Sequence, residues 1–424
     1  MKDLKKLKIA IIGLGYVGLP LALAFSKKFK VLGFDIDNER VKSLKLGKDQ
    51  NNEFGKKDIV NKNLTFSTFE NHLKEQDIFI ITAPTPLQKN NLPNLNLLKN
   101  ATVTVAKNMK KNSIVIIEST VYPGTTEEIC VPLIEKNSKF ILNKTFYCGY
   151  SPERINPGDK IRTITKIKKV VSASNKKTLA IISGLYKEVI NAGIYQARSI
   201  KVAEAAKVIE NTQRDLNIAF INELSFLFSK LKIDTQEVLQ AASTKWNFLN
   251  FQPGLVGGHC VSVDPYYLTY KSRKAGYNPK IILSGRKVNN SVAKFISNQS
   301  IKLMVKKKIN IQNSKILIAG FTFKNDCSDF RNTKVLDIYK YLKKKVKLVD
   351  IYDPLISKNE ILKKHKIKLI DKLKAEFYDG IIIAVNHKIF KNKGIYFFKK
   401  STKKNSFIYD VKNIFEKNKS DLRL

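Results

Sequence analysis

The chain has little cysteine and no long apolar run, and each absence excludes a class of protein. No run of about 18 apolar residues occurs, so no transmembrane helix is expected. The first residues lack the small-residue cleavage site of a signal peptide. The four cysteines are too few and too scattered for a disulfide framework or a zinc site. We therefore expect a cytoplasmic protein that needs neither a metal ion nor a membrane.

Acidic residues are scarce beside basic ones: 36 against 77, which gives a formal net charge of +41 at pH 7. Such a charge can serve nucleic-acid binding, because phosphate contacts require a basic surface. However, the lysines are spread over the whole length, and no nucleic-acid-binding motif occurs. We expect a solvated, lysine-rich surface with no specific nucleic-acid partner. The same positive field would attract an anionic small substrate.

Short apolar strands alternate with helical segments in both halves of the chain. This alternation is typical of doubly wound, mostly parallel sheets. Between the halves, residues 200–231 lack Gly and Pro and have helical periodicity, which predicts a long bridging helix. The polar tail after Phe415 is expected to fray. The predicted strands are 8–12, 31–34, 77–82, 113–117, 315–320, 346–350, 380–385 and 407–410.

These patterns predict an α/β protein with two Rossmann-like domains joined by a long central helix and a helical middle domain. The predicted boundaries are 1–199 for the first domain, 200–305 for the helical domain and 306–424 for the second α/β domain. At 424 residues the chain is long enough for this division.

A dinucleotide-binding turn lies directly after the first predicted strand. The run Gly13-Leu14-Gly15-Tyr16-Val17-Gly18 opens a helix, so its glycines permit a tight turn and close approach of a pyrophosphate. Asp35 ends the second strand, where an acidic residue accepts hydrogen bonds from an adenosine ribose. A carboxylate there disfavours a 2′-phosphate, so NAD is the predicted cofactor. Arg40 is close enough to leave some use of NADP open.

The run Gly257-Gly258-His259-Cys260 places a thiol directly after a glycine pair, with Asp264 four residues on. Glycines let the backbone approach a ligand closely, because they lack a Cβ atom. A free thiol has a pKa of about 8.5, so it needs a nearby base or cation to become a good nucleophile. By itself the run fits either a nucleophile or a buried structural cysteine.

Lys207 and Asn211 stand four residues apart on the predicted long helix and therefore share a face. A cation and an amide that project together can steady an oxyanion and hold a water molecule. A solvated helix face would show the same spacing. The apolar residues between the charges favour a face that is at least partly buried.

Six motifs, in order, make the chain resemble the UDP-glucose/GDP-mannose dehydrogenase family nearly from end to end. The resemblance implies an NAD-binding first domain, a central helical domain that forms a homodimer, and a last domain that binds the UDP-sugar. The motifs are GLGYVGLP at 13–20, ESTVYPGTT at 118–126, SPERINPGD at 151–159, the Lys207/Asn211 helix, GGHCVSVDPYYL at 257–268 and FTFKND at 321–326.

The resemblance also implies a four-electron oxidation through a covalent intermediate. A sugar C6 alcohol loses a hydride to NAD, and a cysteine adds to the aldehyde as a thiohemiacetal. A second NAD takes a second hydride, and the thioester is hydrolysed to a uronic acid. The implied roles are Cys260 as nucleophile, Lys207 for the oxyanion, Asn211 and Thr120 for a water, Asp264 to help activate it, Glu153 beside sugar and water, Arg154, Gly257 and Lys324 on the substrate, and Thr85, Thr120 and Arg331 on the cofactor side.

The motifs depart from the UDP-glucose branch at two positions. Pro157 stands where that branch has a second acidic residue, and Val263 where it has a lysine. The motifs around Glu153 and Cys260, with Thr244-Lys245-Trp246-Asn247-Phe248-Leu249, resemble instead the branch acting on UDP-N-acetylhexosamines. We therefore expect UDP-N-acetylglucosamine or UDP-N-acetylgalactosamine as substrate, for capsule, O-antigen or a similar polysaccharide.

Three alternatives stay open at this point. UDP-glucose and UDP-N-acetylmannosamine are possible substrates of the same chemistry. A two-electron hydroxyacid dehydrogenase can share the first domain and the long helix. It would need neither Cys260 nor a second α/β domain.

Overall fold

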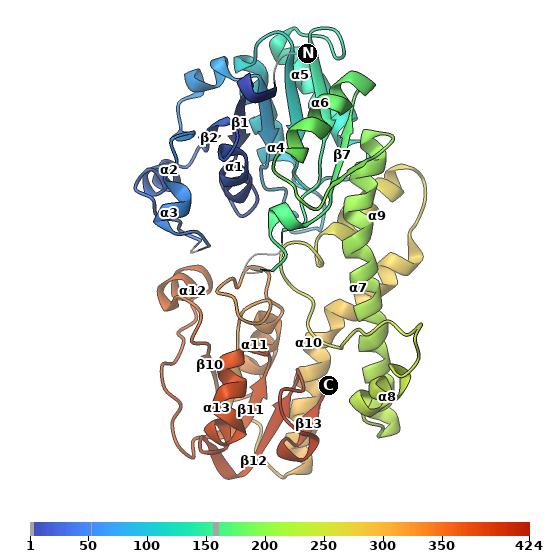
Figure 1. Cartoon of the computed structure of the whole chain (residues 1–424). Coiled ribbons are helices and arrows are strands. Elements are labelled where there is room, and N and C mark those ends of the chain that lie inside the picture. The colour runs from blue at the N-terminus through green and yellow to red at the C-terminus, as the bar shows by residue number, and fades with distance from the viewer. Residues whose placement is uncertain (1–3, 52, 156–160) are drawn as a thin grey trace. The chain divides into compact units, whose positions relative to one another are not determined.

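The computed structural model describes residues 4–51, 53–155 and 161–424, which form two compact units. The first unit comprises Met1–Glu210 with Tyr266–Asn278, and the second comprises Asn211–Pro265 with Pro279–Leu424. Each unit contains a sheet of its own (Figure 1). The predicted α/β class, with two doubly wound sheets and a long central helix, is confirmed. No described helix has the length and apolar composition needed to cross a bilayer.

The described residues of the first unit form a sheet with the strand order β3-β2-β1-β4-β5-β6-β7-β8. All neighbours are parallel except β6 and β7. The central strands read as continuous apolar runs, because parallel sheets are covered on both faces. The strands are β1 (Lys8–Ile12), β2 (Lys30–Phe34), β3 (Leu64–Ser67), β4 (Ile78–Ile81), β5 (Ser113–Ile117), β6 (Phe146–Tyr150), β7 (Lys169–Ala173) and β8 (Ile194–Gln196).

The strand order of this sheet reverses between β1 and β4. Ligands of open α/β sheets bind in the crevice that such a reversal leaves at the carboxyl ends of the strands. Asp37 and Asn175 cap two of the helices, because their side chains accept N–H groups of the first turn. The helices are α1 (Gly18–Ser26), α2 (Asn38–Lys45), α3 (Lys56–Ile59), α4 (Asn96–Asn108), α5 (Val131–Ser138) and α6 (Lys176–Lys187).

The antiparallel strand β7 brings its first residue to the carboxyl edge of the sheet. Tyr150 of β6 pairs with Ser172 of β7, and Gly149 pairs with Ala173. Continuing this register beyond β6 places Glu153 opposite Lys169. A lysine at the start of a strand thereby reaches the edge where ligands bind.

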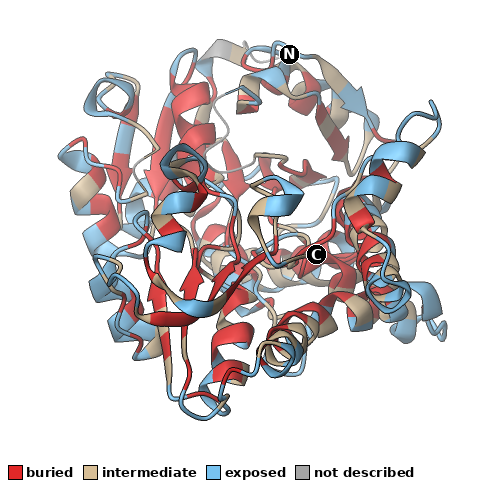
Figure 2. Cartoon of the chain, turned by 90° about the horizontal axis from the view of Figure 1, so that it is seen from below, coloured by how far each residue is buried: buried red, intermediate tan, exposed pale blue. Residues whose placement is uncertain are grey.

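The second unit has a smaller parallel sheet with the order β10-β9-β11-β12-β13. Helix α7 begins in the first unit and continues into the second, and α10 packs against α11. Figure 2 shows buried residues along the strands and exposed residues on the outer turns of the helices. The elements are α7 (Ile200–Leu231), α8 (Thr235–Ala242), α9 (Asp264–Lys274), α10 (Lys280–Lys306), β9 (Lys315–Ala319), α11 (Val335–Lys343), β10 (Leu348–Tyr352), α12 (Lys358–His365), β11 (Tyr378–Ile383), α13 (Lys388–Lys399), β12 (Thr402–Asp410) and β13 (Leu422–Arg423).

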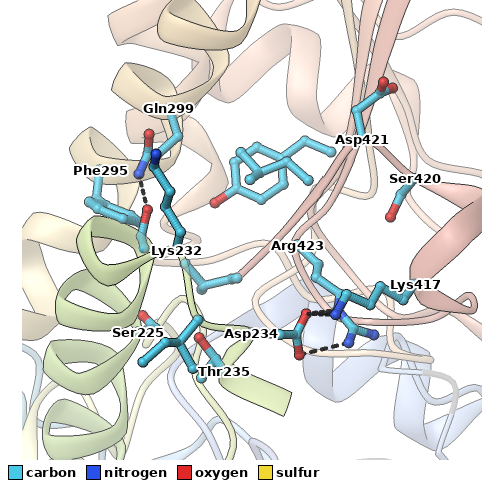
Figure 3. Close-up of a pocket in the computed structure, with 15 residues that line it drawn as sticks. Ser225, Lys232, Asp234, Thr235, Phe295, Gln299, Lys417, Ser420, Asp421 and Arg423 are labelled. Carbon is cyan, nitrogen blue, oxygen red and sulfur yellow. Dashed lines mark hydrogen bonds and ion pairs between the residues drawn. The ribbon is translucent and has the colours of Figure 1, made fainter. Parts of the chain in front are cut away.

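The tail after Phe415 is ordered, so the expectation that it frays is wrong. Leu422 and Arg423 pair with β12 as a short parallel strand, and Leu424 is buried in the core of the second unit. Figure 3 shows the guanidinium of Arg423 against Asp234, at 2.6 and 2.7 Å. Asp234 also caps α8, so this ion pair ties the tail to a helix N-terminus. The pocket of about 280 Å³ beside it contains no residue predicted for the site.

Candidate active site

The glycine turn after β1 has the shape that a dinucleotide pyrophosphate requires. Gly13 has a φ of 94°, and a Cβ atom on Gly18 would lie 1.8 Å from the carbonyl oxygen of Gly13. A Cβ atom on Gly15 would meet nothing within 4 Å, so its backbone faces open space. Thr82 Oγ1 donates to the Gly13 carbonyl at 2.7 Å and holds the turn against β4. The open backbone at Gly15 and the start of α1 together fit a pyrophosphate.

Asp35 and Arg40 hold this turn through hydrogen bonds to the backbone of Leu14, the residue between its first two glycines. The Leu14 N–H donates to Asp35 Oδ2 at 2.7 Å, and Arg40 Nε donates to the Leu14 carbonyl at 3.0 Å. Arg40 Nη1 is also paired with Asp49 at 2.7 Å, and the residue is buried. Two of the guanidinium nitrogens are therefore committed within the protein, which disfavours their use on a 2′-phosphate.

Thr85 and Thr120, both predicted on the cofactor side, lie together at the carboxyl ends of β4 and β5. Thr85 Oγ1 donates to the Thr120 carbonyl oxygen at 2.7 Å. The Tyr267 hydroxyl donates to the Thr85 carbonyl at 2.5 Å. These bonds fix the loop that follows β5 beside the switch point of the sheet.

Glu204 of α7 holds the same loop from another side. Its carboxylate accepts the N–H groups of Gly124 and Thr126, at 2.5 and 2.8 Å. The side chain is fully buried, and burial raises its pKa to about 7 although the two N–H bonds oppose the shift. Sequence reasoning did not select Glu204, because an acidic residue on a helix is usually expected to be exposed to solvent.

The motif after β6 attaches to α7 through Arg154. Its Nη2 donates to the carbonyl oxygens of Ala206 and Lys207, at 3.3 and 2.8 Å, and its Nε pairs with Glu210. The structure thus brings Glu153, Arg154 and Lys207 into one region of the first unit. Lys207 is buried, as the apolar sequence around it indicated. The rest of the motif, residues 156–159 with Pro157, lies outside the described residues.

A buried cluster of charges surrounds Glu153, and sequence reasoning missed it. Lys169 Nζ lies 2.7 Å from Glu153 Oε2 and 2.8 Å from Glu118 Oε2. The Tyr186 hydroxyl donates to the other oxygen of Glu118. Glu118 opens one of the motifs, but nothing in its sequence position indicated a lysine partner 51 residues away.

In the second unit, the glycine pair before Cys260 packs closely on another loop. A Cβ atom on Gly257 would lie 2.7 Å from the Asn332 carbonyl oxygen, and one on Gly258 would lie 2.6 Å from the Phe323 ring. Gly258 also has a φ of 85°, which L-residues rarely adopt. The packing partner, residues 322–334, contains Lys324 and Arg331. The glycines are therefore needed for this contact, whatever the cysteine does.

Cys260 is exposed, so the interpretation as a buried structural cysteine is wrong. Its carbonyl oxygen accepts the Asp264 N–H at 2.9 Å, which makes one helical turn between the thiol and the carboxylate. Asn211 Nδ2 donates to Asp264 Oδ2 at 2.6 Å, and both side chains are buried. The structure thus brings together three of the predicted catalytic residues within the second unit.

The carboxyl ends of β9 and β11 enclose a second pocket of about 190 Å³. The strand order reverses between these two strands, so the pocket lies at a topological switch point. Lys324 and Lys412 supply cationic groups, and Lys412 Nζ donates to the Pro253 carbonyl at 3.2 Å. Burial lowers the pKa of Lys412. The lining consists of Leu255, Gly257, Thr322, Phe323, Lys324, Asn325, Thr333, Lys334, Val335, Ala384, Val385, Asn386 and Lys412.

His387 and Asp353 hold the loop that carries Lys324. Asp353 Oδ2 accepts the Phe321 N–H at 2.6 Å and lies 3.2 Å from His387 Nε2. His387 Nδ1 accepts the Asp326 N–H at 3.0 Å, which assigns the ring proton to Nε2. Arg331, on the same loop, makes a two-pronged ion pair with Asp329 at 2.6 to 3.1 Å.

A dinucleotide turn on one sheet and a cationic pocket beside an exposed cysteine on another define an NAD-dependent oxidoreductase. Comparison with known proteins gives its family. The chain belongs to the UDP-glucose/GDP-mannose dehydrogenase family. Residues 7–190 match the family's NAD binding domain, 201–291 its central domain and 317–417 its UDP binding domain. NAD is therefore its cofactor, as the glycine turn and Asp35 predicted.

Relatives and solved structures match over nearly the whole chain. It is 48% identical to a UDP-N-acetyl-D-glucosamine 6-dehydrogenase of Salmonella typhi, with 100% of both chains covered. It is 48% identical to protein CapL of Staphylococcus aureus, with 96% of both covered. The structure of a UDP-D-ManNAc dehydrogenase from Pyrococcus horikoshii superposes with a TM-score of 0.90 at 29% identity, with 98% of both chains covered.

Proposed function

We propose that this protein oxidises the C6 alcohol of UDP-N-acetylglucosamine to the uronic acid with two molecules of NAD. The observation that carries this proposal is the exposed Cys260, placed by a glycine pair against the loop of the cationic pocket. Relatives named for UDP-N-acetyl-D-glucosamine are 48% identical, whereas the similar structure named for UDP-D-ManNAc is 29% identical. The likeness to CapL supports a role in capsule synthesis.

The first half-reaction converts the alcohol to an aldehyde. The glycine turn at Gly13–Gly18 would hold NAD⁺, which would supply the acceptor for the hydride that leaves the sugar carbon. The alcohol also loses a proton, which a protein group or water accepts. Lys207 stabilises the negative charge that develops on the oxygen, since its ammonium lies on α7 in buried surroundings. Arg154 keeps the Glu153 loop on the same part of α7.

The second half-reaction passes through Cys260. Its sulfur adds to the aldehyde carbon and gives a thiohemiacetal. This becomes a thioester by loss of a proton and of a second hydride, for which a second NAD⁺ would be the acceptor. Water then attacks the thioester, and the acid and the free thiol are released. The roles that we assign in this step are Asn211 and Thr120 for holding the water, Asp264 for helping to activate it and Glu153 for contact with the sugar and the water. The buried Asn211–Asp264 bond supports the joint role of these two residues.

The pocket at the ends of β9 and β11 holds the UDP moiety. Lys324 and Lys412 offer ammonium groups to the diphosphate, and the side-chain amides of Asn325 and Asn386 are available to polar groups of the nucleotide. Gly257 lines the same pocket, so the backbone before Cys260 approaches the diphosphate. Arg331 serves the cofactor side. In this proposal residues 1–199 form the NAD-binding domain, residues 200–305 the central domain and residues 306–424 the UDP-sugar-binding domain. The protein acts in the cytoplasm.

The protein forms a homodimer through the central helical domain. Large apolar side chains are exposed on α7 and on the segment after α8. Single exposed apolar side chains are common on protein surfaces, but a row of them marks an interface. Phe220, Leu227 and Leu231 recur at helical spacing, with exposed fractions of 57, 47 and 56%. Trp246 and Leu249 follow, with 97 and 60%.

Leu227→Asp is expected to convert the dimer to a monomer, because a charge at the centre of the apolar row opposes its burial. Sedimentation velocity measures the outcome. Leu362→Asp is the matched control, since Leu362 on α12 is 48% exposed and lies outside the row. A dimer that persists in Leu227→Asp, or that is lost equally in both variants, contradicts this assignment of the interface.

Substrate choice is tested with purified protein and a panel of UDP-sugars. We expect kcat/KM for UDP-N-acetylglucosamine to exceed that for UDP-glucose by at least about 10²-fold, because a site built for the amide loses paired contacts without it. Two NADH should form per acid released, whereas a hydroxyacid dehydrogenase would form one. UDP-N-acetylgalactosamine and UDP-N-acetylmannosamine complete the panel. A higher kcat/KM for UDP-glucose would refute the proposed substrate.

A further inference from the structure

The cluster around Lys169 is unusual because three charged groups are buried together. The side chains of Lys169, Glu118 and Glu153 are 4, 0 and 5% exposed. Two carboxylates face one ammonium, and the Tyr186 hydroxyl completes the cluster. The Lys169 ammonium also lies 5.3 Å from the centre of the Tyr186 ring. All four residues belong to the first unit.

The fold assembles this cluster through three neighbouring strands of one sheet. Glu118 follows β5, Glu153 lies three residues after β6, and Lys169 opens β7. Because β7 runs antiparallel to β6, its first residue lies at the edge where β5 and β6 end. A parallel β7 would have placed Lys169 at the opposite edge of the sheet, away from the ligand sites.

Stability alone is a poor reason to bury these charges. Removing ions from water is costly, and well-packed apolar residues commonly replace buried ion pairs without loss. Burial raises the pKa of Glu118, as does the neighbouring Glu153 charge, while Lys169 opposes the shift. Burial disfavours the charged form of Lys169, but the two carboxylates outweigh it and raise its pKa. The lysine is thus held as a cation between them.

The contacts leave the Glu153 carboxylate little freedom. Lys169 Nζ donates to its Oε2 at 2.7 Å, and the Arg154 N–H donates to its Oε1 at 2.6 Å. Glu118 and Tyr186 in turn fix the position of the ammonium. Both carboxylate oxygens are therefore oriented, and each keeps a further lone pair for a water or a sugar hydroxyl.

We propose that Lys169 is a positioning residue that fixes the Glu153 carboxylate for hydrolysis of the thioester, with Glu118 and Tyr186 holding Lys169 in place. This inference rests on the proposed function. It assigns to the cluster a task in the step that releases the acid. Formation of the thioester, which needs Cys260 and NAD, does not depend on it.

The test compares Lys169→Met with the wild type in three measurements. We expect kcat for acid formation to fall by about 10- to 100-fold, because a small misplacement of a reacting group has such effects. The KM for the UDP-sugar should change less than threefold. During turnover, intact-protein mass spectrometry should show the acyl-enzyme accumulating, since hydrolysis has become slow. Lys169→Arg keeps the charge and should lose less kcat than Lys169→Met.

A double variant decides whether Lys169 acts through Glu153. If it does, adding Lys169→Met to Glu153→Gln should cost less than threefold beyond Glu153→Gln alone, since the losses are not independent. Losses that multiply would overturn the proposal, because Lys169 would then act elsewhere. Lys403→Met is the control, since it removes another lysine–carboxylate contact of 2.8 Å, with Asp379 in the other unit. It should leave both kcat and the acyl-enzyme level unchanged.

The remaining outcomes separate this inference from the function on which it rests. A wild type that oxidises no UDP-sugar overturns both. An active wild type whose Lys169→Met variant keeps its kcat, with no acyl-enzyme, overturns only the role of Lys169. If Lys169→Met does not fold, Lys169→Arg and Glu118→Gln undergo the same measurements, and wild-type behaviour in both overturns the proposal.

Discussion

Cys260→Ala should reduce the synthesis of uronic acid by at least about 10³-fold, because the variant has no sulfur to form the thioester. NAD should bind with unchanged affinity, since the glycine turn and Asp35 belong to a different unit. The UDP-sugar should also still bind, because Gly257 and Lys324 remain in place. NADH and acid per UDP-sugar, with the two dissociation constants, measure these expectations.

Cys260→Ser gives a finer test of covalent catalysis. A serine oxygen can form an ester, and esters hydrolyse more slowly here without a strong base, so an acyl-enzyme should accumulate and be visible by mass spectrometry. Cys327→Ala is the matched control, because Cys327 is the other cysteine of the second unit and is partly buried. It should retain full activity. Acid formation by Cys260→Ala at a near wild-type rate would contradict nucleophilic catalysis by this thiol.

Arg286→Met should lower the free energy of unfolding by about 3–5 kcal/mol, because it leaves a buried carboxylate without its cation. Arg286 of α10 pairs with Asp215 of α7 at 2.5 Å, and both are buried. Asn289 donates to the same oxygen of Asp215 at 2.6 Å. Thermal and denaturant unfolding of the variant measure the loss.

The loss should depend on pH in a defined direction. Burial already raises the pKa of Asp215 above 3.8, and Arg286 opposes that shift. Without Arg286 the folded-state pKa rises further. A raised carboxyl pKa costs nothing below the unfolded value, and the cost grows as the pH rises through the folded one. The variant should therefore be least destabilised near pH 4 and most at neutral pH.

A second substitution in this ion-pair network should restore part of the lost stability. Asp215→Leu combined with Arg286→Met removes both charges and should recover part of the lost stability. Lys8→Met is the control, because the Lys8–Glu75 pair is at the surface, with 42 and 72% of the side chains exposed. It should barely change the unfolding midpoint. A loss in Arg286→Met no larger than that in Lys8→Met would show that the buried pair is not needed for stability.

The sequence was sufficient where the signal is local. Apolar runs such as 8–12 and 113–117 predicted β1 and β5, and the absence of Gly and Pro in 200–231 predicted α7 with its bounds. Strands β3, β6, β7, β8 and β13 were missed. Strands β3, β8 and β13 have only two to four residues, and β6 and β7 contain glycine or polar residues instead of a continuous apolar run. The tail after Phe415 was expected to fray because its composition is polar, although its last residue, Leu424, is buried.

The same distinction between local and long-range signals applies to the residues of the site. Motifs identified Cys260, Asp264 and Thr120 because each lies in a distinctive local run. Lys169 was missed because its partner Glu118 lies 51 residues away and only the strand order brings the two together. Glu204 of α7 was not selected, and its partner Gly124 lies 80 residues away in the loop after β5. Arg40 was assigned to the cofactor from its distance to Asp35. Its contacts with Asp49 and Leu14 show that it also braces the turn.

The amide of Asn222 sets the distance between α7 and the cysteine. Its Oδ1 accepts the Gly254 N–H at 2.7 Å, and its Nδ2 donates to the Gly254 carbonyl at 3.1 Å. The side-chain amide thus bonds to both backbone groups of Gly254, as a neighbouring β-strand would, and fixes the position of this residue against α7. The six residues that follow Gly254, up to Cys260, therefore set how far the thiol lies from this anchored position. We therefore expect insertions to be tolerated within the exposed segment 243–250, and insertions between Gly254 and Cys260 to displace the thiol.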